Sequence, residues 1–223
     1  KKLWRNMIST EFRNRFLTSI LLLILTFLLI KSNIALICSL LILGIFSLIE
    51  FYSLTKKIFK NNFFYFIANI SFTIYMFLFC YFFIYFSLII QFKIIIFILL
   101  FGCIASDLGG YIFGKIFKGP KLTKISPNKT ISGSIGSFIF TYCFILIPIF
   151  FITNKINFEI LIISLITSLG CQIGDLFFSF LKRTAKVKDT SNYLPGHGGF
   201  LDRLDGILLG LPMGIITLFL LHI

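Results

Sequence analysis

The sequence predicts an all-α, polytopic integral membrane protein with about seven transmembrane helices. Of its 223 residues, 58% are hydrophobic and 31 are phenylalanine, and the mean hydropathy is +1.01. A water-soluble core of this size could not bury so many large apolar side chains. In a bilayer, helices satisfy their own backbone hydrogen bonds, and the apolar runs are long enough for helical spans. We therefore expect residues 1–223 to form a single integral membrane domain.

The spans are expected in the apolar runs between the polar segments. The first two can form a tight hairpin, because only Lys31-Ser32-Asn33 separates them. Residues 63–105 carry a single charge, on Lys93, and can be divided in more than one way. The count of seven is therefore approximate. In chain order the expected spans are about 16–30, 34–50, 67–90, 94–114, 131–152, 158–180 and 205–222.

The net charge of +13 predicts an orientation in the membrane. Nucleic-acid binding is not indicated, because spans interrupt the basic residues and no soluble basic face forms. With the N-terminus in the cytoplasm, the basic segments 56–60, 115–129 and 182–203 share the cytoplasmic side. The other side receives only Lys31, Lys93 and Lys155. We expect a multi-pass protein of the cell (inner) membrane whose polar segments face the cytoplasm and contact anionic lipids.

Several isolated residues receive no catalytic role. The cysteines lie in apolar runs without metal-ligand spacing, which favours small buried hydrophobic side chains over zinc ligands or disulfides. His222, near the C-terminus, is expected at the interface. The acids Glu11, Glu50 and Glu159 each stand alone, and no chemistry is assigned to them.

A first polar block spans residues 106–115 and continues through residues 121–133. Its glycines would let backbone N–H groups approach an anion, while its lysines and hydroxyls suit a phosphate. Two other interpretations stay open: glycines in membrane helices also serve close packing, and a basic loop also sets topology. On composition alone, this block is a weak indication of phosphate binding.

A second polar block begins at Asp175, after a long uncharged run. Ser179 and Lys182 follow at helical spacings of four and three, so the three side chains can share a helix face. A carboxylate in hydrocarbon is costly unless a cation or basic partner compensates it. The alternative to a functional site is an ion pair of Asp175 with Lys182 or Arg183.

Asp202 and Asp205 are three residues apart and share a face if the last helix begins there. Two carboxylates so placed repel each other unless a cation lies nearby, and oxygen ligands beside phosphates favour Mg²⁺. Helix capping is the alternative, but it does not explain Arg203 or the preceding His197-Gly198-Gly199. His197 could act as a general base, a phosphate donor or a loop hydrogen-bonder. No second His or Cys stands at zinc-ligand spacing.

At these residues the chain resembles the phosphatidate cytidylyltransferase family, also called CDP-diacylglycerol synthases. The downstream pattern is matched by Ser179, Lys182, Arg183, Lys188, Asp189, Pro195, His197, Gly198, Gly199, Asp202, Arg203 and Asp205. The upstream pattern is matched by Asp107, Gly109, Tyr111, Gly114, Lys115, Ser126, Pro127, Lys129 and Thr130. The resemblance covers about 106–136 and 170–210, and the signature region is 170–210. Ile131 and Ser132 stand where the family commonly has Trp and an acid or amide, and Gly110 replaces the usual Ala.

The resemblance implies that CTP and phosphatidic acid are the substrates, that CDP-diacylglycerol and pyrophosphate are the products, and that Mg²⁺ is required. Asp175 and Asp202, with Asp205, are the expected metal ligands. The expected catalytic set is Asp175, Lys182, Arg183, Lys188, Asp189, His197, Asp202, Arg203 and Asp205. The expected substrate-binding set is Asp107, Lys115, Ser126, Lys129, Thr130, Ser179, Gly198 and Gly199.

Other functions stay open at this stage. A CTP-dependent membrane lipid (polyprenol) kinase would share nucleotide, metal and membrane. An ion transporter could also place Asp107 and Asp175 in spans, but it should not need the loop from Lys188 to Gly199. A CDP-alcohol phosphotransferase is disfavoured, because Asp205-Gly206-Ile207-Leu208 does not continue that class's motif. A homodimer is compatible with the sequence, which does not itself specify an oligomeric state.

Overall fold

The computed structural model describes residues 26, 28–123, 126, 129–155, 157–191, 193 and 198–221. In these ranges all regular structure is helical, apart from isolated bridge positions such as the pair Lys121 and Thr130. Among the described residues, six helices are each long and apolar enough to cross a membrane. The prediction of an all-α polytopic membrane protein is therefore confirmed. The helices are α2 (Asn33–Ile58), α3 (Asn62–Ser87), α4 (Ile90–Phe117), α5 (Ile131–Thr153), α6 (Phe158–Thr184) and α7 (Leu201–Leu220).

These helices correspond to the second to seventh of the predicted spans. The first predicted span, about 16–30, falls mostly on residues outside the described part of the chain. The largest difference in length is in α2, which continues to Ile58 where the prediction ends near residue 50. The added turns carry Lys56 and Lys57, whose positive charges are favourable at a helix C-terminus.

Short polar residues set several helix ends. The side chains of Ser32 and Asn61 accept hydrogen bonds from Ala35 N–H and Phe63 N–H at the starts of α2 and α3. Thr130 accepts from Gly133 N–H and begins α5 at the edge of the first polar block. Capping of this kind satisfies N–H groups that a helix start leaves without partners.

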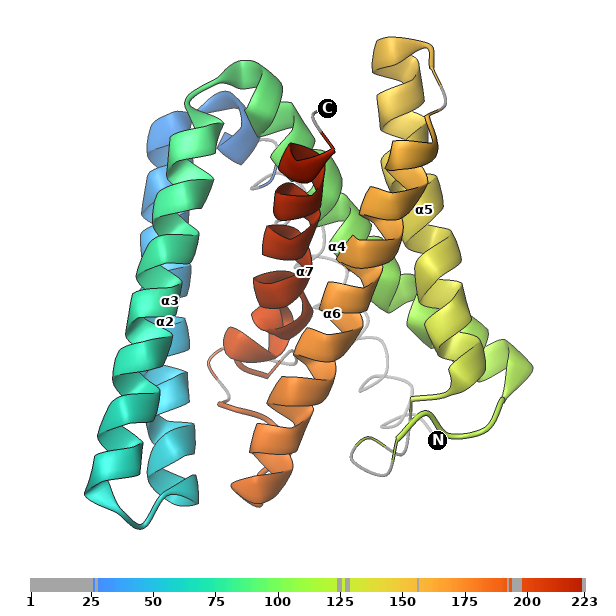
Figure 1. Cartoon of the computed structure of the whole chain (residues 1–223). Helices are drawn as coiled ribbons and strands as arrows, with labels where there is room; N and C mark the ends of the chain where they lie inside the picture. The colour runs from blue at the N-terminus through green and yellow to red at the C-terminus, as the bar shows by residue number, and fades with distance from the viewer. Residues whose placement is uncertain are drawn as a thin grey trace, which may run out of the picture.

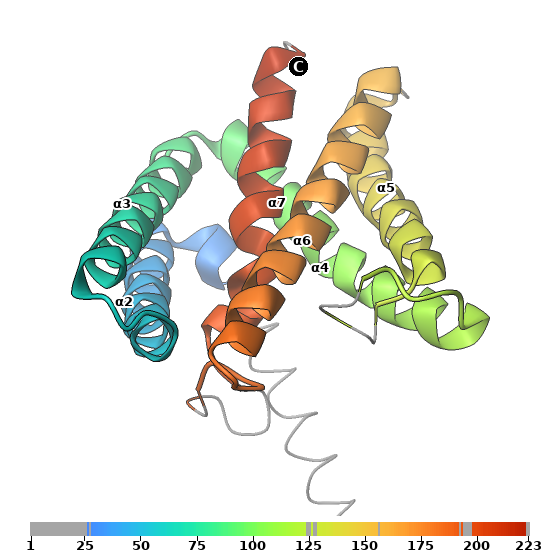
Figure 2. The ribbon, with the colours of Figure 1, turned by 60° about the horizontal axis from the view of Figure 1, so that its bottom comes forward.

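The helices form three groups (Figures 1 and 2). α2 and α3 make a hairpin along one side, and α5 packs on α4 at the opposite side. α6 and α7 lie between these two groups and pack closely on each other. α4 runs diagonally from the end of α3 to the start of α5 and contacts both central helices. The central pair therefore touches every other part of the described fold.

Successive helices alternate in direction, so the end of α2, α4 and α6 and the start of α3, α5 and α7 lie at one end of the molecule (Figure 1). We call this the basic end. The described basic residues at the opposite end are Lys31, Lys93 and Lys155. Those at the basic end are Lys56, Lys57, Lys60, Lys115, Lys118, Lys121, Lys129, Lys182, Arg183, Lys186, Lys188 and Arg203. This asymmetry is the pattern expected of a membrane protein with one cytoplasmic face.

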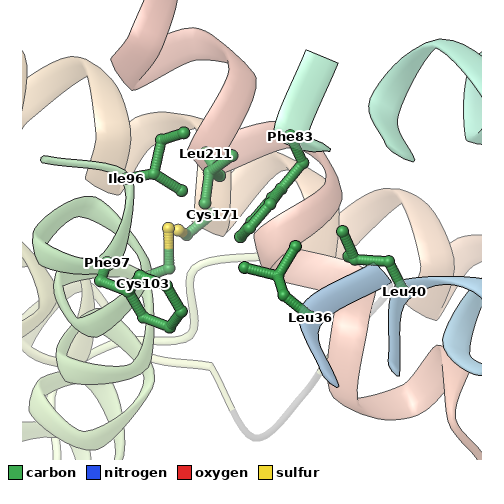
Figure 3. Packing of buried hydrophobic residues seen from close by; sticks show 8 residues of the cluster. All are labelled: Leu36, Leu40, Phe83, Ile96, Phe97, Cys103, Cys171 and Leu211. Carbon is green, nitrogen blue, oxygen red and sulfur yellow. The ribbon is translucent and has the colours of Figure 1, made fainter. Parts of the chain in front are cut away.

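Apolar side chains fill the contacts between the groups. One buried cluster joins residues of α2, α3, α4, α6 and α7 (Figure 3). In it, Cys103 of α4 and Cys171 of α6 point toward each other and are free thiols. On the outside, Phe77 is 69% exposed and Phe151 is 78% exposed. Large aromatic side chains on the surface suit contact with lipid and not with water.

α6 and α7 approach most closely at glycines. A Cβ at Gly174 would meet the carbonyl oxygen of Asp205 and would lie 3.2 Å from the Gly206 Cα. Small residues at a membrane helix interface allow the backbones to come this near. The absence of a side chain at Gly174 therefore sets the separation of α6 and α7 beside Asp175 and Asp205.

Gly174→Ala is expected to lower the stability of the folded protein by about 1–3 kcal/mol, the usual cost of overpacking. The added methyl group has backbone atoms in front of it and must push the two helices apart. Gly44→Ala is the matched control, because the nearest atom to a Cβ there is Cys80 Sγ at 3.6 Å, an ordinary contact. Thermal unfolding in detergent micelles compares them. Equal melting temperatures for both variants would contradict the packing argument.

Candidate active site

The close contact of α6 and α7 brings three acidic side chains near one another. Asp175 follows Gly174, and its carboxyl group lies against Gly206 on α7. The side chains of Asp175 and Asp205 are within hydrogen-bonding contact, and Asp107 of α4 lies within electrostatic range of both. Two carboxyl groups in contact need a proton or a cation between them. This cluster of Asp107, Asp175 and Asp205 is called the acidic cluster below.

Lys129 supplies one positive charge to the acidic cluster. Its Nζ lies 2.8 Å from Asp175 Oδ2. Both side chains keep some exposure, 29% for Lys129 and 20% for Asp175. The pair joins the segment before α5 to the start of the signature region, 46 residues further along the chain. Asp175 therefore pairs with a lysine of the first polar block, and the ion pair considered above with Lys182 or Arg183 is not the one observed.

A cavity of about 250 Å³ opens beside this ion pair. Cavities for whole small-molecule ligands usually measure roughly 300–1,000 Å³, so this one suits part of a larger ligand. Its walls carry hydroxyl, amide, carboxylate and ammonium groups, which can hydrogen-bond a sugar, a base or a phosphate. The polar residues that line it are Ser106, Asp107, Tyr111, Lys129, Thr130, Ser134, Ser137, Gln172 and Asp175.

Lys182, about two helical turns after Asp175 on α6, supplies a second positive charge. Its Nζ lies 2.8 Å from Asp202 Oδ1 and 3.6 Å from Asp205 Oδ2. The lysine side chain is 13% exposed and its two partners are 9% and 14% exposed. Because α7 begins at Leu201, Asp202 and Asp205 lie in its first turns and do share a face, as their spacing indicated.

Asp202 is the most heavily engaged of the aspartates. Besides Lys182, its carboxylate accepts hydrogen bonds from Thr190 N–H at 2.9 Å, the Thr190 hydroxyl at 3.0 Å and Gly199 N–H at 3.1 Å. Three of these contacts fall on Oδ2, and the contact with Lys182 falls on Oδ1. In this arrangement Asp202 organises the loop between α6 and α7.

The acidic cluster offers a donor set that fits a hard divalent cation. Mg²⁺ in proteins is commonly held by one or two carboxylates, with waters and substrate phosphates completing its coordination. Asp175 and Asp205 provide such a pair, and their mutual contact calls for compensating positive charge. Within the described ranges, however, no three Asp, Glu, His or Cys side chains form a ready metal-binding group. The predicted trio of Asp175, Asp202 and Asp205 is thus not preassembled, and its assignment to a metal stays a prediction.

Other predicted site residues surround this centre. Thr130 lines the cavity, Ser179 is half-buried one turn after Asp175, and Gly198 lies against Asp202. Arg203 is within electrostatic range of Asp107. Exposed loop or helix-end positions are occupied by Arg183, Lys188 and Asp189. His197 lies outside the described residues.

Two residues of the first polar block serve local structure. The ammonium of Lys115 contacts the ring and the hydroxyl of Tyr111, 5.5 Å from the ring centroid. Ser126 makes backbone turn contacts with Thr123 and Lys129. Ser132, at one of the two positions that depart from the family pattern, accepts a hydrogen bond from Gly119 N–H. Their roles in substrate binding stay predictions.

Two polar residues near the site, Gln172 of α6 and Glu50 of α2, were not predicted from the sequence. Gln172 forms hydrogen bonds with Ser134 of α5 and lines the cavity. It lies one helical turn after Ser168, to which it also donates a hydrogen bond, and this spacing could have indicated a polar face of α6. Glu50 is buried in α2 yet reaches the loop before α7. The signal for Glu50 was present, since an acid inside an apolar span is rarely without a role.

Comparison with known proteins relates the sequence to one family. The sequence matches the cytidylyltransferase family over residues 3–221. It is 40% identical over 114 residues to a phosphatidate cytidylyltransferase of Mycobacterium leprae (strain TN), over 51% of this chain and 36% of the relative. It is 44% identical over 113 residues to proteins of the same name from Staphylococcus haemolyticus (strain JCSC1435) and Staphylococcus aureus (strain COL), over 48% of this chain and 42% of each relative. The aligned part thus spans less than half the length of these relatives.

The match covers almost the entire chain, and the acidic and basic residues of the two polar blocks meet at the basic end of the fold. The chain therefore belongs to the cytidylyltransferase family.

Proposed function

We propose that the protein transfers a cytidylyl group from CTP to phosphatidic acid and produces CDP-diacylglycerol and pyrophosphate for phospholipid synthesis. One observation carries the proposal: Lys129 from the segment before α5, Asp175 and Lys182 of α6, and Asp205 of α7 converge at the basic end of this cytidylyltransferase-family protein. The relatives named above bear the name of this activity.

The chemistry suits charged groups with little need for a strong base. A phosphate monoester oxygen, already anionic near neutral pH, attacks the α-phosphorus of CTP. A new P–O bond forms, the bond to the bridging oxygen of the β-phosphate breaks, and pyrophosphate leaves with that electron pair. The main barrier is the mutual repulsion of the two anions, so catalysis should consist chiefly of charge neutralisation and in-line positioning.

Lys129 and Lys182 are assigned to the phosphates. Lys129 lies at the cavity beside Asp175 and is the basic group nearest to a nucleotide fragment held there. Lys182 stands between two carboxylates of α7 and is held in place before substrate arrives. Such preorganised charges need little rearrangement during reaction, which is what makes them effective. Arg203 and the exposed Arg183 and Lys188 are assigned to the outer phosphates or to the lipid phosphate.

Asp175 and Asp205 are assigned to Mg²⁺, and Asp107 lies close by, whereas Asp202 is already engaged by Lys182, Thr190 and Gly199. When bound, the ion supplies positive charge to the phosphate oxygens of the nucleotide. The two aspartates keep their carboxyl groups in contact through the packing of Gly174 against α7. Their spacing therefore depends on helix packing and not on loop conformation.

The membrane location suits a lipid substrate. We propose that the basic end faces the cytoplasm of the cell membrane, where CTP is available and where lysines contact anionic headgroups. The acyl chains of phosphatidic acid then stay in hydrocarbon while the phosphate reaches Lys182 and Lys129. Exposed aromatic side chains on the flanking helices keep this end inserted in lipid.

Turnover of labelled CTP by the purified protein tests the proposal. With phosphatidic acid and Mg²⁺, we expect a labelled lipid and free pyrophosphate, and no product when either the lipid or Mg²⁺ is omitted. Label on the cytosine ring distinguishes this from a lipid kinase, which would release labelled CDP and leave the lipid without cytidine. Release of CDP, or no turnover with any lipid phosphate, would contradict the proposed activity.

A further inference from the structure

Glu50 is a buried acid whose contacts reach the candidate active site. It lies in the membrane-spanning helix α2 and is 1% exposed. A carboxylate in such a place is costly unless hydrogen bonds or charges compensate it. Packing alone would be served better by an apolar residue of similar size. The contacts of Glu50 therefore indicate what it does.

Four donors surround the Glu50 carboxylate, two on each oxygen. Oε1 accepts from Phe200 N–H at 2.9 Å and from the Ser191 hydroxyl at 2.5 Å. Oε2 accepts from Leu201 N–H at 2.8 Å and from the Thr190 hydroxyl at 2.7 Å. These bonds fill the four acceptor positions of the group. One side chain of α2 thus holds both ends of the stretch from residue 190 to residue 201.

The same contacts cap α7. Its N-cap residue, Phe200, has no side-chain acceptor for the first N–H groups of the helix. Glu50 takes this role from a different helix and adds negative charge at the positive end of the α7 dipole. Because Asp202 and Asp205 stand in the first turns of α7, the place where that helix starts determines where their carboxyl groups lie.

A second route joins Glu50 to Asp202 through Thr190. The Thr190 hydroxyl lies within hydrogen-bonding distance of Glu50 Oε2 and of Asp202 Oδ2, and Thr190 N–H also donates to Asp202. A hydroxyl carries one proton and can donate to only one of the two carboxylates at a time. Gly199, whose N–H donates to Asp202, leaves no room for a Cβ, which would lie 2.5 Å from Glu50 Oε2.

We propose that Glu50 is a positioning residue for the cytidylyl-transfer site: it fixes the start of α7 and the Thr190 region, and through them the carboxylates of Asp202 and Asp205 and the ammonium of Lys182. This inference rests on the proposed function. Glu50 itself touches neither the acidic cluster nor Lys182 in any contact that the described residues make, so it acts through the loop and the helix start.

Glu50→Gln tests the proposal with a nearly isosteric side chain. Each carboxylate oxygen of Glu50 accepts a hydrogen bond from one backbone N–H. In either orientation of the glutamine amide, its NH₂ group therefore faces one of these N–H groups, from which it cannot accept a hydrogen bond. We expect kcat per folded molecule to fall on the order of 100-fold, the scale of a misplacement of about 1 Å at a reacting centre, with the KM for CTP within about threefold of the unchanged enzyme. We also expect faster hydrogen exchange at Phe200 N–H and Leu201 N–H.

Glu159→Gln is the matched control, because Glu159 lies in the first turn of α6 at the opposite end and contacts Asn157. It should leave kcat and the exchange of both amides unchanged. Wild-type kcat in Glu50→Gln would overturn the proposal. A lower kcat with unchanged exchange at residues 200 and 201 would also overturn it, since the effect would not pass through the start of α7.

Two further arms cover the remaining outcomes. If Glu50→Gln does not fold, Thr190→Val removes only the bridging hydroxyl and should lower kcat about tenfold. Thr153→Val, at the opposite end, is its control and should not lower kcat. Equal kcat values for these two variants would overturn the proposal. The exchange measurement needs no turnover, so it reports on the Glu50 contacts even if no cytidylyl transfer is found. Inactive wild-type protein would refute the proposed function, whereas altered exchange in Glu50→Gln would still identify Glu50 as the anchor of α7.

Discussion

Asp175→Asn is expected to lower kcat on the order of 10³-fold, about 4 kcal/mol of transition-state stabilisation. The change keeps the size of the side chain and removes its charge. It leaves the ammonium of Lys129 without its 2.8 Å partner and leaves Asp205 as the single carboxylate of the proposed metal pair. Because hard cations need anionic oxygen ligands, positive charge at the phosphates should be lost as well.

Steady-state kinetics at several Mg²⁺ concentrations, with thermal unfolding in detergent, separates this effect from misfolding. The melting temperature should change little, since Asp175 keeps a fifth of its side-chain surface exposed and its pairing with Lys129 contributes modestly to stability. Glu159→Gln is again the control for loss of one acid at the opposite end. Near-normal kcat of Asp175→Asn at saturating Mg²⁺ would defeat the assignment.

Lys182→Ala is expected to reduce both activity and stability. The lysine neutralises Asp202 at 2.8 Å and Asp205 at 3.6 Å in a largely buried setting. Removing one partner of a buried pair leaves the remaining charge uncompensated and commonly costs about 3–5 kcal/mol. Here the orphaned carboxylates belong to the start of α7, so the loss should also disturb the acidic cluster. We expect a lower melting temperature and a fall in kcat of at least about 10²-fold.

Lys182→Arg distinguishes charge from geometry. It restores the positive charge, but a planar guanidinium does not reproduce the contacts of a compact ammonium. We expect it to recover most of the melting temperature and only part of kcat. Lys155→Ala, an exposed lysine at the opposite end, controls for the loss of one positive charge. A fully active and stable Lys182→Ala protein would show that the pairs with Asp202 and Asp205 have no functional part.

The sequence allowed most of the fold to be predicted, because hydrophobic runs of this length have one structural solution in a bilayer. It also indicated that the aspartates of the signature region matter, since Asp202 and Asp205 are neighbours on one helix by spacing alone. Spacing did not indicate how close these two aspartates lie to Asp175. That relation depends on Gly174 packing against α7, which is a property of two helices and is not visible in either one.

Partners that are distant in the sequence could not be found in this way. Lys129 and Asp175 are 46 residues apart, and Glu50 and Leu201 are 151 residues apart. Several lysines of the first polar block were equivalent as partners on composition, and only the packing of α4, α5 and α6 selects Lys129. Glu50 stood out as an acid in an apolar span, but the sequence did not indicate its partners. Its donors come from a loop that the helical arrangement brings back toward α2.

Binding of Mn²⁺, a paramagnetic substitute for Mg²⁺, tests whether Asp175 and Asp205 hold the metal ion. The measurement is electron paramagnetic resonance of purified protein with Mn²⁺ and a non-hydrolysable CTP analogue, so it requires no turnover. We expect saturable nucleotide-dependent Mn²⁺ binding by the unchanged protein and by Glu159→Gln, and we expect this binding to be lost when Asp175 and Asp205 are both replaced by Asn. Wild-type Mn²⁺ binding by a folded Asp175→Asn, Asp205→Asn protein would contradict this metal assignment.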